Sequence, residues 1–99
     1  MMNKDYNRQN LEYRAAQYYA AIRLPEKEWK TIADLEPQLL EFEHYVRASA
    51  YDEAARLLNE IDFNYLTLWG HVRRVITMRE KITDKIRDPQ LKAMHLTYM

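Results

Sequence analysis

The segment Glu41-Phe42-Glu43-His44 comes nearest to a known chemical site in this chain. A Glu followed three residues later by a His places both side chains on one face of a helix, as in the di-iron sites of helical bundles. Such a site also needs a second Glu-x-x-His pair and two further inward-facing Glu. His71 is preceded by Leu68 at that spacing, and His95 by Lys92. The set is therefore incomplete, and we expect no metal site.

No other group of side chains forms a catalytic pattern. Ser49 is the one serine, and it stands in an expected turn without a neighbouring His or Asp, so a serine nucleophile is not expected. The chain has no cysteine and a single glycine, which excludes thiolate chemistry and a Gly-rich phosphate-binding loop. The sequence thus predicts a protein that is not an enzyme and has no cofactor.

The composition indicates one helical domain. The chain has 99 residues, with one Gly, three Pro and many strong helix formers. No stretch approaches the eighteen or so apolar residues of a membrane span, and the first ten residues are too polar for a signal peptide. The absence of cysteine fits a reducing compartment. We expect a cytoplasmic protein without a membrane span.

Charge is unevenly distributed although the formal net charge is zero. Residues 24–62 carry four basic and ten acidic side chains, and residues 63–99 carry seven basic and three acidic ones. Two interpretations stay open: the charges cover solvated helix faces, or the acidic middle lies against the basic C-terminal part or meets a basic partner. No RNA-binding motif accompanies the basic residues, so nucleic acid is not an expected partner; these residues are Arg73, Arg74, Arg79, Lys81, Lys85 and Arg87.

Hydrophobic periodicity and local breaks predict the helices. They are expected near residues 7–23, 35–48, 51–62, 65–86 and 89–99, within one domain spanning 1–99. Thr31 and Asp34 suit a capping box, and Asp88 before Pro89 suits the start of the last helix. Gly70 falls inside the long helix 65–86, where either close packing of a neighbouring helix or a position that is simply not optimised would account for it.

The apolar stripes of these helices predict the core. Its expected members are Leu11, Tyr18, Ile22, Leu39, Phe42, Val46, Ala54, Leu57, Leu58, Ile61, Leu68, Val72, Val75 and Ile82. The resulting fold class is all-α, with antiparallel helical hairpins stacked as a short tetratricopeptide-like solenoid or bundle.

The segment from Tyr51 to Leu58 resembles the second helix of a tetratricopeptide repeat, with Tyr51, Ala54 and Leu58 at the aromatic, small and large apolar positions. The turn carries Ser49 in place of the usual glycine, so the hairpin is divergent. Nearly the whole chain is similar to a segment of bacterial NB-ARC or STAND-type signalling ATPases that joins the nucleotide-binding part to a tetratricopeptide sensor array. The segments carrying this likeness include 13–19, 28–30, 34–39, 41–44, 61–66 and 68–71.

This resemblance implies a non-enzymatic protein-interaction or regulatory module, and a fragment or truncated member of a longer repeat array. The expected partner is another protein or the rest of such an array, and a homodimer through residues 65–99 is the simplest self-association. The expected partner-binding residues are Trp69, Arg73, Ile76, Met94 and Tyr98. The alternative is a helical adaptor that binds nucleic acid or anionic membrane through the basic C-terminal third.

Overall fold

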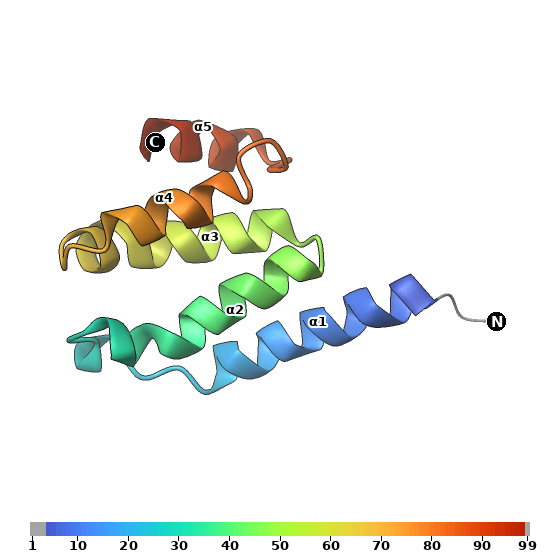
Figure 1. Ribbon diagram of the computed structural model, residues 1–99, viewed down its shortest axis with the longest axis horizontal. Coiled ribbons are helices and arrows are strands. Elements are labelled where there is room, and N and C mark those ends of the chain that lie inside the picture. Colours follow the sequence, from blue (N-terminus) through green and yellow to red (C-terminus); the bar gives the residue numbers. More distant parts are fainter. Residues whose placement is uncertain (1–3, 99) are drawn as a thin grey trace.

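The chain folds as a stack of helices (Figure 1). The computed structural model describes the backbone of residues 4–98 and the side-chain surroundings of residues 8–96. Within this part the elements are helical and no strand occurs, which confirms the predicted all-α class; they are α1 (Lys4–Ala21), α2 (Glu36–Arg47), α3 (Tyr51–Ile61), α4 (Val72–Glu80) and α5 (Pro89–Tyr98), with 3₁₀ segments η1 (Glu26–Glu28) and η2 (Ile32–Leu35) and a π-helical segment η3 (Asp62–Thr67). None of the described helices has the length and apolar character needed to cross a bilayer.

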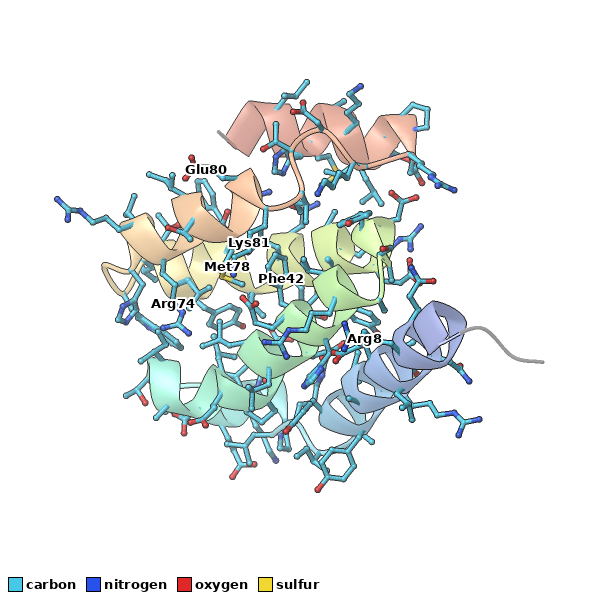
Figure 2. The ribbon with its side chains drawn as sticks, turned by 45° about the vertical axis from the view of Figure 1, so that its right-hand side comes forward. Arg8, Phe42, Arg74, Met78, Glu80 and Lys81 are labelled. Atoms are coloured by element: carbon cyan, nitrogen blue, oxygen red, sulfur yellow. The ribbon has the colours of Figure 1, made fainter. Side chains whose placement is uncertain are left out.

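The core lies between α2, α3 and α4. Eight of the predicted core residues are buried there: Leu39, Phe42, Ala54, Leu57, Leu58, Ile61, Val75 and Ile82. Val46 is partly buried and packs against them. Figure 2 shows Met78 on the side of α4 that faces Phe42 of α2, and Glu80 on the opposite side. Removing these apolar side chains from water is the main favourable contribution to folding.

Two parts of the predicted core are wrong. Leu11 and Tyr18 are 64% and 61% exposed, and Ile22 is also exposed. α1 turns its other face toward α2, where Ala16 is buried, Tyr13 meets the Tyr45 ring edge-on and Tyr19 stacks on His44. α1 carries apolar side chains on both faces, so periodicity does not decide which face packs.

The second error concerns Leu68 and Val72, which the sequence places in a continuous helix 65–86. The chain leaves the helix at Gly70, whose φ of +93° belongs to the left-handed region. The His71 amide donates to the Leu66 carbonyl at 2.8 Å and the Gly70 amide donates to the Thr67 carbonyl at 3.0 Å, the two hydrogen bonds of a Schellman motif. Gly70 therefore ends one helix, and α4 starts afresh at Val72.

Ser49 plays the same role between α2 and α3. It has a φ of +60°, the Ala50 amide donates to the Tyr45 carbonyl at 2.8 Å, and the Ser49 amide donates to the Val46 carbonyl at 3.0 Å. The predicted small turn residue is thus a helix C-terminal residue in the left-handed region. This tight turn folds α3 back beside α2 (Figure 1).

Two predicted helix starts are confirmed. Thr31 and Asp34 form a capping box, in which the amides of Lys30 and Thr31 donate to the Asp34 carboxylate, both at 3.0 Å. These hydrogen bonds lower the pKa of Asp34 because they favour its ionised form. Asp88 caps α5 by accepting the Gln90 amide at 2.9 Å.

Candidate protein-binding surfaces

The outer side of α4 and of the turn before it exposes apolar side chains. Leu68 is 74% exposed, and Val72 and Ile76 follow at four-residue steps with about half of their surface in solvent. Arg73 and Arg74 are exposed beside them, whereas Val75, Met78 and Arg79 face inward. We call Leu68, Val72, Arg73 and Ile76 the α4 face. Apolar surface flanked by arginine is typical of protein-binding surfaces.

The five predicted partner-binding residues do not all belong to this face. Arg73 and Ile76 do, but Trp69 is only partly exposed, because its ring lies edge-on against Tyr65 at 5.6 Å and packs on the core. Met94 is exposed on α5, a separate helix that packs on α3. The side chain of Tyr98 lies outside the described side chains. Sequence reasoning missed Leu68 and Val72, which it placed in the core.

A groove of about 250 Å³ opens between the end of α1, α2 and α3. Arg23 bridges two of its carboxylates, with 2.9 Å bonds to Glu41 and to Glu60. Burial raises the pKa of Glu41, and Arg23 opposes that effect. Burial and the Glu41 carboxylate raise the pKa of the nearby Tyr45 to about 12. Arg23, Glu41 and Glu60 of the groove pair with one another, and these ion pairs hold the end of α1 against α2 and α3.

The Glu41 and His44 side chains of the Glu-x-x-His segment do not converge. Glu41 bonds Arg23, while His44 Nδ1 lies 2.7 Å from the carboxylate of Glu12 on α1. Among the described residues, no three side chains of the metal-ligating types gather into a site. Ser49 Oγ accepts a 3.4 Å hydrogen bond from Gln9 at the exposed turn. This geometry offers no nucleophile paired with a base.

A buried polar cluster joins η3, α4 and α5. The guanidinium of Arg79, only 1% exposed, donates to Asp62 Oδ2 from Nε at 3.1 Å and from Nη2 at 2.5 Å. Thr67 Oγ1 donates to the other oxygen of Asp62 at 2.5 Å. In the sequence Arg79 belongs to a run of basic residues, yet in the fold it is one of the most completely buried side chains.

The same cluster defines the protonation of His95. Its Nδ1 lies 3.2 Å from Arg79 Nη1, which can only donate, so Nδ1 accepts and the ring is neutral. Nε2–H then donates to Thr83 Oγ1 at 3.0 Å, and the Thr83 hydroxyl donates to the Arg79 carbonyl at 2.8 Å. Burial and the neighbouring Arg79 charge lower the pKa of His95. The cluster is a structural link that fixes α5, and it is closed to solvent.

Other basic side chains of the C-terminal third also have partners within the fold. Lys81 Nζ bonds Glu43 at 2.7 Å, and Lys85 Nζ lies 5.2 Å from the centre of the Tyr51 ring. Together with the Arg79–Asp62 pair, these contacts join the acidic middle of the sequence to its basic C-terminal part. This arrangement agrees with the interpretation that the acidic middle lies against the basic part. The basic residues of this part of the sequence therefore do not form one continuous surface: Arg79 is buried, Lys81 and Lys85 contact other side chains, and Arg73 and Arg74 are exposed.

Comparison of the chain with protein-family models, with curated protein sequences and with solved structures gives no match.

Proposed function

We propose that this chain is a non-enzymatic protein-binding module of the cytoplasm, whose α4 face receives a partner protein. The observation that carries the proposal is the pair of exposed apolar side chains Val72 and Ile76, one turn apart on α4 beside two arginines, with Leu68 exposed in the turn that precedes the helix. Clustered apolar surface on a small domain marks a site of association. Arg73 gives such a site the charge-assisted hydrogen bonds that are enriched at interfaces.

The proposal includes a stacked, tetratricopeptide-like arrangement of the hairpins. Supporting it are the tight α2–α3 turn at Ser49, the small buried Ala54 and Ala55 that let helices approach closely, and the resemblance of residues 51–58 to a repeat helix. The likeness to the helical segment of signalling ATPases suggests a regulatory setting, in which such a stack binds proteins.

The alternative, an adaptor for nucleic acid or anionic membrane, has less support. Of its basic residues, Arg79 is buried, Lys81 pairs with Glu43 and Lys85 lies over Tyr51. Phosphate binding scales with the number of cations that can neutralise it. The chain should therefore show no salt-sensitive binding to a DNA duplex or to anionic vesicles at micromolar concentration.

The test is site-specific photo-crosslinking in cells of the source organism. A photoreactive phenylalanine at Ile76 should give adducts of defined mass that excess wild-type chain competes away and the Ile76→Glu variant does not. The same residue at Asp84, an exposed position after α4 that lies outside both apolar surfaces, serves as the control. Identical adducts from both positions, or none from Ile76, would contradict a partner on the α4 face.

A further inference from the structure

The outer side of α1 presents a second apolar surface, separate from the α4 face. Leu11, Ala15 and Tyr18 recur at steps of four and three residues along it, and Ile22 follows four residues later, directly after the end of the helix; Leu11 and Tyr18 are largely exposed and Ile22 is about half exposed. We call these four residues the α1 stripe. The opposite side of α1 already packs on α2. A helix with apolar residues on both sides fits a position between two neighbours, and α2 supplies one of them.

We propose that the α1 stripe pairs with the α1 stripe of a second copy of this chain, in an antiparallel and two-fold symmetric dimer. Its three- and four-residue spacing is that of a coiled-coil seam. In the antiparallel register that matches the two stripes, Leu11 of each copy faces Ile22 of the other, and Ala15 faces Tyr18. Each large side chain then meets an apolar neighbour, and the small Ala15 makes room for a tyrosine.

Charge complementarity selects this partner and this direction. Arg8 is exposed one turn before Leu11, at the edge of the stripe, and η1 follows the other end of the helix with Glu26 and Glu28. The antiparallel register brings Arg8 of each copy toward η1 of the other, whose two glutamates outnumber its one lysine, Lys27, so two net attractive contacts form. A parallel pair would place Arg8 against Arg8, which is repulsive. Glu26 accepts a hydrogen bond from Tyr65, which leaves exposed Glu28 as the better acceptor for Arg8.

The length of α1 sets the strength of the pair. Its eighteen residues span about 27 Å, whereas the nine residues of α4 span only about 14 Å. A single helix pair of this length falls at the small end of specific interfaces, below about 1,200 Å², where association is reversible. The dimer should therefore dissociate on dilution.

Engineered cysteines test the register, because the chain has none of its own. In a mixture of Leu11→Cys and Ile22→Cys chains, oxidation should give the cross-linked heterodimer. Leu11→Cys alone should not cross-link, because its two copies lie eleven residues, or about 16.5 Å, apart along the antiparallel pair. Cross-linking of Leu11→Cys with itself and not with Ile22→Cys would overturn the antiparallel pair.

Sedimentation measures the association itself, with a matched control. Ile22 and Ile76 are 47% and 48% exposed, so Ile22→Glu and Ile76→Glu make the same chemical change at equal exposure. Ile22→Glu should raise the dimer dissociation constant at least tenfold, and Ile76→Glu should leave it unchanged. Arg8→Glu should weaken the dimer, and adding Glu28→Arg should restore it.

The proposal would be overturned by a wild-type chain that stays monomeric to hundreds of micromolar, by equal effects of Ile22→Glu and Ile76→Glu, or by dimerisation that only Ile76→Glu removes. Vesicle binding by the α1 stripe in place of dimerisation would do the same. Circular dichroism should show an unchanged fold in each variant, since both isoleucines lie outside the core. Crosslinking at Ile76 is scored separately, so the proposed function can stand or fall independently of the dimer.

Discussion

The buried ion pair of Arg79 and Asp62 allows a quantitative prediction. Both side chains are at most 4% exposed, and Asp62 accepts two hydrogen bonds from Arg79 and one from Thr67. Asp62→Asn removes the negative charge with little change of shape and leaves the guanidinium buried without its counter-charge. Breaking a buried pair in this way costs about 3–5 kcal/mol. Arg79→Met, which leaves the carboxylate buried alone, should cost a similar amount.

The double variant separates the pair from its surroundings. Asp62→Asn with Arg79→Met leaves no charge in the cluster, so it should lose at least about 2 kcal/mol less than the sum of the single losses. Some loss should remain, because Asn59 and His95 no longer receive hydrogen bonds from Arg79. Their cost is that of neutral groups, and it is smaller than that of an unpaired charge.

Urea unfolding followed by circular dichroism measures these free energies, with the slope in urea as the check that the same transition is compared. A loss below about 1 kcal/mol for Asp62→Asn, or strictly additive losses, would refute the argument that a desolvated charge pair links η3 to α4. If the single variants do not fold, the argument requires that the double variant does.

Four further predictions concern single positions. Gly70→Ala should destabilise the chain by about 1–2 kcal/mol because Ala is strained at a φ of +93°. A higher melting temperature of this variant would instead support a continuous helix there. Ser49→Gly should stabilise by up to about 1 kcal/mol, since glycine adopts the left-handed region without strain. Gln38 is fully buried, and neither of its amide atoms has a hydrogen-bond partner among the described residues. Gln38→Met should therefore raise stability by about 1–3 kcal/mol in urea unfolding, and a loss would show that the amide is satisfied. Because the pKa of His95 is lowered in the folded chain, the imidazole of the unfolded chain becomes protonated at a higher pH than that of the folded chain. Stability should thus be complete above the ordinary histidine pKa of about 6.5 and decrease as the pH falls toward the lowered value; His95→Asn, which keeps an acceptor for Arg79, should flatten that dependence.

Features that depend on local chemistry can be predicted from the order of residues along the chain. The helices now assigned to 36–47, 51–61 and 89–98 were predicted to within one residue at each end. Local signals mark several of these limits: Pro37 in the first turn of α2, the turn at Ser49, and Asp88 before Pro89. These groups interact with backbone only a few residues away, so their effect can be predicted from the local sequence.

Gly70 is a local signal for the end of a helix, and its predicted place in a helix interior is wrong. A glycine that follows an apolar helical pattern commonly ends the helix, because it alone enters the left-handed region without cost. If Gly70 is taken as an interior residue, the two segments are predicted as one helix, and Leu68 and Val72 are predicted to be buried. With the helix ended at Gly70, the sequence leaves the face of the following helix undecided.

Tertiary structure alone decided which side of each helix is covered. α1 has Tyr19 and Ala16 on one side and Leu11 and Tyr18 on the other, so a pattern of apolar spacing supports either choice. The contacts with α2 settle it in favour of the polar and aromatic side, through Tyr19 on His44 and Arg23 on Glu41. Burial is a property of the neighbours of a side chain as much as of the side chain itself.

The fate of Arg79 has the same cause. Its sequence neighbourhood is basic, but its partners Asp62 and His95 stand seventeen residues before and sixteen residues after it. A charge can be buried only when folding brings its counter-charge and hydrogen-bond acceptors to it from other elements. Composition and periodicity thus indicate that this chain is helical, and long-range packing decides which of its apolar and charged side chains remain exposed.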